Sequence, residues 1–214
     1  MKKTILFLTI YCILFSLSAQ GHLDGGATAL LREISNKYQK FTTMQIDYSY
    51  KAEKDQKVSD TQKGKIKIKG NQYYFTFAGQ AFYCDGVSIW NYQKESNEIS
   101  IFEYDDSDDN MINPAKLLAG WEKNFRAKII REEFENNKNL ILIDLTPIKN
   151  ESYYRIRLYI DKAKNEIIRV AVYEKDNTIY TYFFDKFITN VPMDDKQFKL
   201  NPADYPNAQI NDMR

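Results

Sequence analysis

Few residues of this chain could perform nucleophilic, redox or metal chemistry. The 214 residues include one histidine, His22, and two cysteines, Cys12 and Cys84. A Ser-His-Asp triad, a multi-histidine metal site and a CxxC redox centre are all difficult to build from one histidine and two cysteines that lie far apart in sequence. Cys84 has no histidine to lower its pKa, so we expect a small apolar residue rather than a nucleophile. We expect no enzyme, and neither a metal nor a cofactor.

The carboxylates are arranged no more favourably. The cluster at 105–109 (DDSDD) lacks the glycine and the late glutamate of a calcium loop, so it is interpreted as a solvated acidic loop. Glu132-Glu133 and Asp194-Asp195 are adjacent pairs. Neighbours on a strand point to opposite faces, so neither pair can share one substrate. With a net charge of +1, the chain also lacks the basic excess that nucleic-acid binding requires.

The first residues have the pattern of an export signal. Two lysines at the start are followed by an uncharged run from Thr4 to Leu17 and by small residues at Ser18-Ala19. A permanent span needs roughly 20 apolar residues, so we expect cleavage near Ala19 and a soluble product. The expected organisation is a signal peptide at 1–19 and one domain at 20–214. Only Cys84 then remains, which excludes an internal disulfide.

Hydrophobic periodicity predicts one long helix followed by strands. Apolar residues from Ala27 to Phe41 recur with helical spacing. From Met44 onward the period is two, and strands are predicted at 44–51, 65–69, 73–77, 82–84, 87–92, 99–104, 127–134, 140–145, 154–160, 167–173 and 179–187. Short helical segments are expected at 113–118, extended by Trp121 and Phe125, and at 194–198. Residues 201–214 are expected to be an irregular tail.

Short polar turns between consecutive strands predict an antiparallel meander. This many strands must curl, so the expected fold is mainly β (α+β): a single antiparallel, strongly curved incomplete β-barrel with an α-helical lid. The row Lys65, Lys67 and Lys69 forms the polar side of one strand, facing solvent or steering an acidic partner.

The aromatic content leaves two interpretations open. The chain has 16 Tyr, 13 Phe and 2 Trp. These rings could fill an ordinary barrel core, or they could line a cavity. A curved sheet with one amphipathic helix has the shape of a cup and lid, and an aromatic cup without catalytic groups suits an apolar ligand.

Several motifs in order resemble the LolA-type family of periplasmic outer-membrane lipoprotein carriers, in the form found in Bacteroidota. The most specific is the run from Cys84 to Tyr92, close to the family's DGxxLWxY signature. The others are Leu30-Leu31 to Tyr38, Met44-x-Ile46-Asp47-Tyr48, Gly64 to Tyr73, Asn113-Pro114-x-Lys116-Leu117-Leu118, Ile143 to Pro147 and Asp212-Met213-Arg214.

The resemblance implies a cavity for acyl chains on the concave face of the sheet. Its expected lining is Leu31, Ile34, Met44, Ile46, Tyr48, Ile66, Ile68, Tyr73, Phe75, Phe77, Trp90, Tyr92, Leu117, Leu118 and Trp121. Proteobacterial members carry Arg-Pro before the strand that begins near Tyr73, and the arginine holds the lid. Lys69-Gly70 stands there in this chain, which makes Lys69 the lid-latch candidate, although lysine lacks the planar fork of arginine.

The function implied by the resemblance is that of a monomeric periplasmic carrier. Such a protein accepts lipoproteins from an ABC transporter of the inner membrane and takes them to an outer-membrane acceptor, whose identity the sequence does not give. The alternative is a periplasmic sensor or adaptor on the same scaffold that binds a protein partner instead of lipid. A hydrolase would need a Ser/Lys pair that the sequence does not reveal.

Overall fold

The structure, a computed structural model, describes residues 24–105 and 120–214. The expected signal peptide, the expected helix at 113–118, most of the acidic loop, and Leu117 and Leu118 lie outside these ranges. Among the described residues, no helix is long and apolar enough to cross a membrane.

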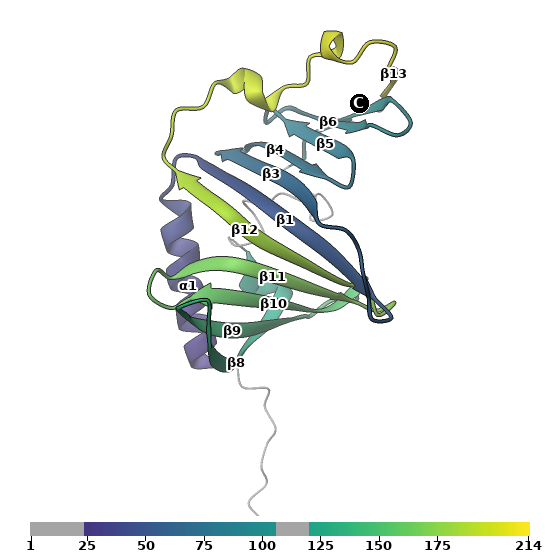
Figure 1. Ribbon diagram of the computed structural model, residues 1–214. Helices are drawn as coiled ribbons and strands as arrows, with labels where there is room; N and C mark the ends of the chain where they lie inside the picture. Colours follow the sequence, from purple (N-terminus) through teal and green to yellow (C-terminus); the bar gives the residue numbers. More distant parts are fainter. Residues whose placement is uncertain (1–23, 106–119) are drawn as a thin grey trace, which may run out of the picture.

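One curved sheet dominates the molecule (Figure 1). Its strands are β1 (Met44–Lys54), β2 (Lys57–Val58), β3 (Gln62–Lys69), β4 (Gln72–Phe77), β5 (Gln80–Cys84), β6 (Ser88–Gln93), β7 (Glu98–Glu103), β8 (Phe125–Glu135), β9 (Lys138–Pro147), β10 (Tyr153–Asp161), β11 (Glu166–Glu174), β12 (Ile179–Thr189) and β13 (Gln209–Asp212). The period-two alternation therefore predicted all of these strands except β2 and β13, and the expected curved, open, mainly β architecture is confirmed.

The sheet consists of two antiparallel meanders that meet at one central pair. The strand order is β13-β7-β6-β5-β4-β3-β1-β12-β11-β10-β9-β8, with β2 added to β1. The pairing of β1 with β12, from Met44 with Thr189 to Glu53 with Ile179, joins the two meanders. Register shifts at Asp47/Tyr48 and at Ile129/Arg131 are irregularities of the bulge type, which bend and twist a sheet.

The C-terminal segment differs from the expectation. It contains two short 3-10 helices, η1 (Asp195–Phe198) and η2 (Pro202–Asp204), and the edge strand β13. The helical turn expected at 194–198 is confirmed, but the prediction of an irregular tail at 201–214 is wrong. β13 pairs with β7 in parallel, so one edge of the sheet departs from the antiparallel pattern.

Helix α1 (Gly25–Gln39) lies across one face of the sheet. Asp24 caps its N-terminus, and its buried residues Ala27, Leu31, Ile34 and Tyr38 fall on the predicted apolar stripe. A single turn, α3 (Trp121–Asn124), precedes β8. We call the face of the sheet that α1 covers the inner face and the opposite one the outer face.

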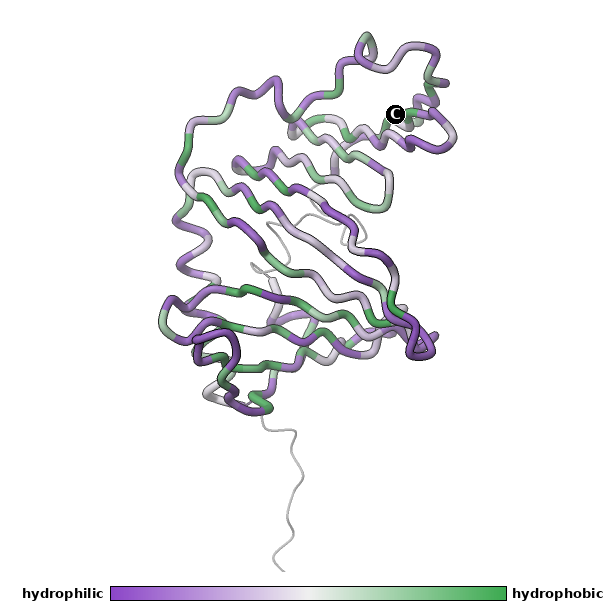
Figure 2. The backbone as a smooth tube through the Cα atoms, in the orientation of Figure 1, coloured by the Kyte–Doolittle hydropathy of each residue, from purple (hydrophilic) through white to green (hydrophobic). Residues whose placement is uncertain are grey.

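Register assigns the side chains to the two faces. Ile46 lies opposite both Phe187 and Ile66, and Ile66 lies opposite Phe75, so these four share the inner face. Asp47 lies opposite both Lys65 and Lys186 on the outer face. Coloured by hydropathy, the strands alternate between hydrophilic and hydrophobic residues along their length (Figure 2).

Candidate functional site

Helix α1 fills one half of the inner face. Leu31 and Ile34 of the helix are 1% and 0% exposed and belong to the same buried cluster as Ile143 and Leu158 of the sheet. The cluster also includes Ala27, Tyr38, Trp121, Phe125, Ala127, Ile141, Leu145, Ile156, Ile160 and Ile167. We call this part the helix-covered half. The residues of this cluster are almost completely shielded from solvent, as in an ordinary protein core.

Two hydrogen bonds, one partly buried and one buried, attach the ends of α1 to the sheet. The Asp24 carboxylate accepts from Gly26 N–H at the helix terminus and, through its other oxygen, from Ile129 N–H of β8 at 2.9 Å. These bonds lower the pKa of Asp24, the one from Ile129 most strongly. Near the other end, the Tyr38 hydroxyl accepts from Ile167 N–H at 3.1 Å, and burial raises the pKa of Tyr38 to about 12.

Exposed polar contacts add to this attachment. The Arg32 guanidinium donates to both carboxylate oxygens of Glu122, at 2.7 and 2.9 Å. The Lys37 ammonium lies 3.0 Å from the Glu166 carboxylate in β11. Helix α1 is thus attached to this half through its apolar stripe, at both ends and along its length.

The remaining inner face is formed by aromatic and aliphatic side chains of the sheet itself. Its best-buried members are Ile46, Tyr48, Tyr50, Ile68, Tyr73, Phe75, Cys84 and Ile89. Around them lie the partly buried Met44, Ile66, Phe77, Phe82, Phe102, Tyr104, Tyr182, Phe184 and Phe187. We call these residues the aromatic half. The rings of Phe75 and Phe82 stack with centroids 4.4 Å apart.

A glycine shapes the aromatic half. Gly64 of β3 lies opposite Tyr48 of β1, and a Cβ at Gly64 would stand 2.2 Å from Cζ of that ring. The ring therefore crosses β3 directly above the glycine, and its hydroxyl donates to the Thr76 carbonyl of β4 at 2.5 Å. The Tyr50 hydroxyl accepts from Ala78 N–H in the next turn. Desolvation raises the pKa of Tyr48 well above its ordinary value.

The structure brings together most of the residues that the resemblance implied. Leu31, Ile34 and Trp121 lie in the helix-covered half, and Met44 packs against both halves. The aromatic half contains Ile46, Tyr48, Ile66, Ile68, Tyr73, Phe75 and Phe77.

Trp90 and Tyr92 do not lie with them. Trp90 is paired with Tyr83 and Ile101, and this row belongs to the outer face. There Trp90 packs in a cluster with Leu200, and the ring of Tyr92 lies 4.1 Å from that of Tyr205, centroid to centroid. The segment that follows β12 covers these two residues, so they do not line the inner face.

Lys69 also lies on the outer face. Its ammonium donates to the Met193 carbonyl at 3.1 Å and to the Asp195 carboxylate at 2.6 Å. These contacts attach the C-terminal segment to β3 and do not reach α1. The interpretation of Lys69 as a latch on the helix is therefore corrected: the polar contacts that hold α1 include those of Asp24, Arg32, Glu33, Lys37 and Tyr38.

Several inner-face residues were missed from the sequence. Phe82, Phe102, Tyr182, Phe184 and Phe187 all belong to the aromatic half. The alternation of Tyr180, Tyr182 and Phe184 was a usable signal, because Tyr182 lies opposite Tyr50 and Phe184 opposite Tyr48.

No metal centre forms among residues 24–105 and 120–214. No group of three or more His, Cys, Asp and Glu side chains in these ranges is placed to hold a metal ion. Cys84 is buried, and desolvation raises the pKa of its thiol, which disfavours the reactive thiolate. The chemistry that the inner face offers is contact with apolar groups.

Comparison with known proteins gives one family and several distant structures. The family described as "Outer membrane lipoprotein carrier protein LolA" matches residues 39–201. An uncharacterized protein of Methanocaldococcus jannaschii is 21% identical over 206 residues, covering 95% of this chain, and the chain spans 60% of that protein's length.

Two solved structures are similar at low identity. An uncharacterized conserved protein from Thermus thermophilus is 11% identical with a TM-score of 0.56, over 86% of this chain and 98% of that one. A LolA superfamily protein from Nitrosomonas europaea is 13% identical with a TM-score of 0.42, over 81% and 97%. The family match covers most of the chain, including all of the aromatic half, and the protein therefore belongs to the LolA family of outer membrane lipoprotein carrier proteins.

Proposed function

We propose that this protein is a periplasmic carrier that binds the acyl chains of lipoproteins on its aromatic half and carries them from the inner to the outer membrane. Residues 1–19 direct export, and residues 20–214 act as a monomeric carrier domain. An ABC transporter of the inner membrane loads it, and an acceptor at the outer membrane unloads it. Family membership supports the general role.

The observation that supports the proposal most directly is the character of the aromatic half. All of its members are uncharged, and nearly all come from strands β1 and β3 to β7 or from β12. Burying acyl chain contributes about 0.8 kcal/mol per methylene, so a sixteen-carbon chain gains on the order of 10 kcal/mol against water. The same chain gains as much in a bilayer, which permits release there.

The two halves differ in their capacity to receive a chain. Leu31 and Ile34 in the helix-covered half are fully buried, whereas Phe77, Phe82 and Phe102 in the aromatic half keep part of their surface exposed. A ligand can gain contact with rings that are incompletely covered without displacing a packed helix. We therefore assign acyl binding to the aromatic half.

The test replaces Phe82 by Glu. Phe82 is partly exposed, so the fold should tolerate the change, but an acyl chain would bury the carboxylate without a partner. We expect Phe82→Glu to bind a fluorescent fatty-acyl probe and a triacylated lipopeptide at least tenfold more weakly than wild type. Phe82→Leu keeps apolar surface and should bind nearly normally. Mass spectrometry of protein isolated from the periplasm should show bound lipoprotein for wild type and not for Phe82→Glu.

Tyr154→Glu is the matched control. Tyr154 is an aromatic residue with 47% of its surface exposed, and it lies beside Tyr173 and Arg155 and belongs to none of the inner-face clusters. The Tyr154→Glu variant should bind the acyl probe as tightly as wild type does. Wild-type affinity in a folded Phe82→Glu protein contradicts the binding site. A periplasmic protein that carries a stable protein partner and no lipid contradicts the carrier function.

A further inference from the structure

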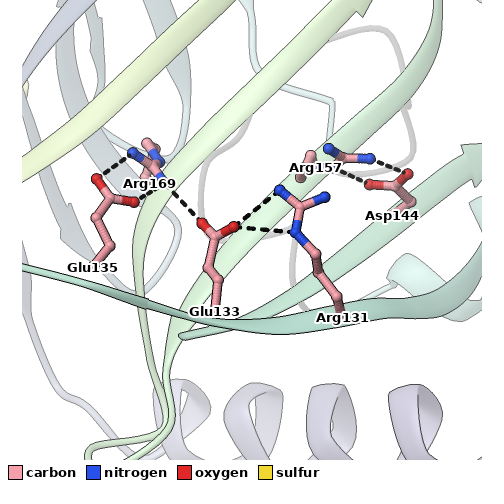
Figure 3. A network of polar contacts seen from close by, with 6 residues as sticks. All are labelled: Arg131, Glu133, Glu135, Asp144, Arg157 and Arg169. Atoms are coloured by element: carbon pink, nitrogen blue, oxygen red, sulfur yellow. Dashed lines mark hydrogen bonds and ion pairs between the residues drawn. The ribbon is translucent and has the colours of Figure 1, made fainter. Parts of the chain in front are cut away.

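The outer face has two parts, which differ in whether their cationic side chains are paired with carboxylates. On β8 to β11, Arg131, Arg157 and Arg169 are paired with carboxylates (Figure 3). Arg157 makes a two-pronged contact with the buried Asp144, at 2.6 and 2.8 Å. Arg169 bonds both oxygens of Glu135 and stacks on Tyr159, with the guanidinium carbon 3.7 Å from the ring centroid. These charges are neutralised within the protein.

The neighbouring strands β12, β1 and β3 present lysines instead. We call the outer-face residues Lys51, Lys63, Lys65, Lys67 and Lys186 the lysine face. Register places Lys186 and Lys65 on either side of Asp47, and Lys63 opposite Ser49. Lys51 lies opposite Thr181 of β12. The five side chains therefore project from three adjacent strands on the same side of the sheet.

Most of this positive charge has no partner within the described part of the chain. Asp47 lies 3.4 Å from Lys65, and Asp185 accepts a hydrogen bond from Ser49. Lys51, Lys63 and Lys186 are exposed and make no ion pair with a described residue. Lys67 donates to Gln197 of the C-terminal segment. The lysine face thus sets five cations against three carboxylates, those of Asp47, Asp185 and Glu53, in a chain whose total charge is only +1.

The chemistry of the lysine face favours a diffuse anionic surface. Lysine is a compact, hydrated charge on a flexible stem and does not impose the planar geometry that arginine does. Gln45, Ser49 and Thr181 between the lysines are polar. The nearest rings, Phe183 and Tyr74, are partly buried and lie against the cations of Arg169 and Lys67, so the lysine face offers no exposed aromatic anchor of the kind that dominates protein interfaces. Four or more basic residues on one surface are sufficient for attraction to anionic lipid head groups.

We propose that the lysine face docks the protein onto the surface of anionic phospholipid bilayers. The contact is electrostatic and reversible, and it does not bury the inner face. Docking by the lysine face raises the time that the protein spends beside a membrane, whatever the inner face carries. It is therefore separable from acyl binding.

The experiment measures binding to vesicles by sedimentation, using protein isolated from the periplasm. The vesicles contain phosphatidylethanolamine with or without phosphatidylglycerol. We expect wild type to bind the anionic vesicles and to be released by salt, because exposed charges are screened within about 10 Å at 0.1 M. The triple variant Lys51→Gln, Lys63→Gln and Lys186→Gln should bind about a hundredfold more weakly, since each lysine contributes roughly a factor of five.

The control removes the same charge elsewhere. Lys94, Lys123 and Lys149 are exposed, and they lie in turns, loops and the short helix α3 rather than on the lysine face. Changing all three to Gln should leave vesicle binding within about threefold of wild type. Both triple variants should bind the fatty-acyl probe normally, so failure of the docking proposal and failure of the carrier proposal give different results.

Three outcomes would overturn the proposal: wild type that ignores anionic vesicles, a lysine-face variant that binds them normally, or a control variant that loses binding equally. Loss of transfer to a protein acceptor in the lysine-face variant, without any vesicle binding by wild type, would assign the face to an acidic protein instead.

Discussion

Tyr48 shows how one residue depends on a residue of another strand. Its ring is 5% exposed and passes over Gly64, which places its hydroxyl on the Thr76 carbonyl two strands away. An aromatic ring that covers a glycine on the neighbouring strand pins register and fills the space that a missing side chain leaves. The pair therefore fixes the position of β1, β3 and β4 relative to one another within the aromatic half.

We predict that Gly64→Ala destabilises the protein by about 1–3 kcal/mol, the usual cost of overpacking. The new methyl group would displace the Tyr48 ring and break the hydrogen bond to Thr76. Urea denaturation measures the effect. Gly25→Ala is the control, because nothing lies within 4 Å of a Cβ at that position. Equal stability of the two variants would show that the Tyr48 ring moves aside without lowering the free energy of unfolding.

The sequence alone did not show on which face of the sheet Trp90 lies. The two-residue turn at Gly70-Asn71 sets Tyr73 opposite Ile68, so its inner orientation follows from sequence. The face of Trp90 depends on the longer connection between Cys84 and Ile89, which are paired directly. A loop one residue shorter or longer would move every side chain of β6 to the other face. Tyr73 and Phe75 could therefore be assigned from sequence, and Trp90 could not.

Among the secondary-structure elements, the C-terminal segment and helix α1 show most clearly what the side-chain pattern can and cannot predict. It runs over the outer face, where Gln197 accepts a hydrogen bond from Lys67 and Tyr205 bonds Tyr83 through their hydroxyls. β13 was missed because Gln209, Ile210, Asn211 and Asp212 show no apolar alternation. The strand forms because its backbone pairs with β7, and backbone pairing leaves no mark on side-chain pattern. By contrast, α1 could be predicted from the sequence, because the side chains that it buries are mostly apolar and recur with helical spacing.

We predict that Lys69→Ala loosens the C-terminal segment and leaves α1 unaffected. The variant loses both bonds to the segment, at Met193 and Asp195. Hydrogen exchange should become faster at 193–198 and stay unchanged at 25–39. Lys37→Ala is the complementary variant, because Lys37 bonds Glu166 and the Lys164 carbonyl from α1. Faster exchange of α1, or weaker acyl binding, in Lys69→Ala would restore Lys69 as the latch.

The whole molecule should respond to alkaline pH as one unit, because its buried tyrosines are distributed over both halves. Desolvation raises the pKa of Tyr38 to about 12 and moves those of Tyr73 and Tyr182 upward as well. An unfolded tyrosine ionises at about pH 10. Since the folded pKa is the higher one, this contribution to stability is complete below about pH 10 and is lost as the pH rises toward 12.

We therefore predict a cooperative alkaline transition above about pH 10. Tyrosinate absorbance and the loss of circular dichroism should change together, because the buried hydroxyls ionise when the sheet opens. Tyr38→Phe should shift this transition only slightly, since other tyrosines with a raised pKa remain. Full tyrosinate absorbance near pH 10 with unchanged circular dichroism would contradict the prediction.

The central pairing of β1 with β12 has a consequence for the order in which the chain folds. Met44 finds Thr189 only after the chain has been made as far as β12, whereas within β1 to β7 and within β8 to β12 every strand pairs with one close to it in sequence. Contacts between distant residues form slowly, because the loop between them must close first. During synthesis, one edge of β1 therefore stays open while β3 to β7 assemble beside it. An incomplete chain exposes that edge to other extended segments, so the last strands of the second meander protect the first from aggregation.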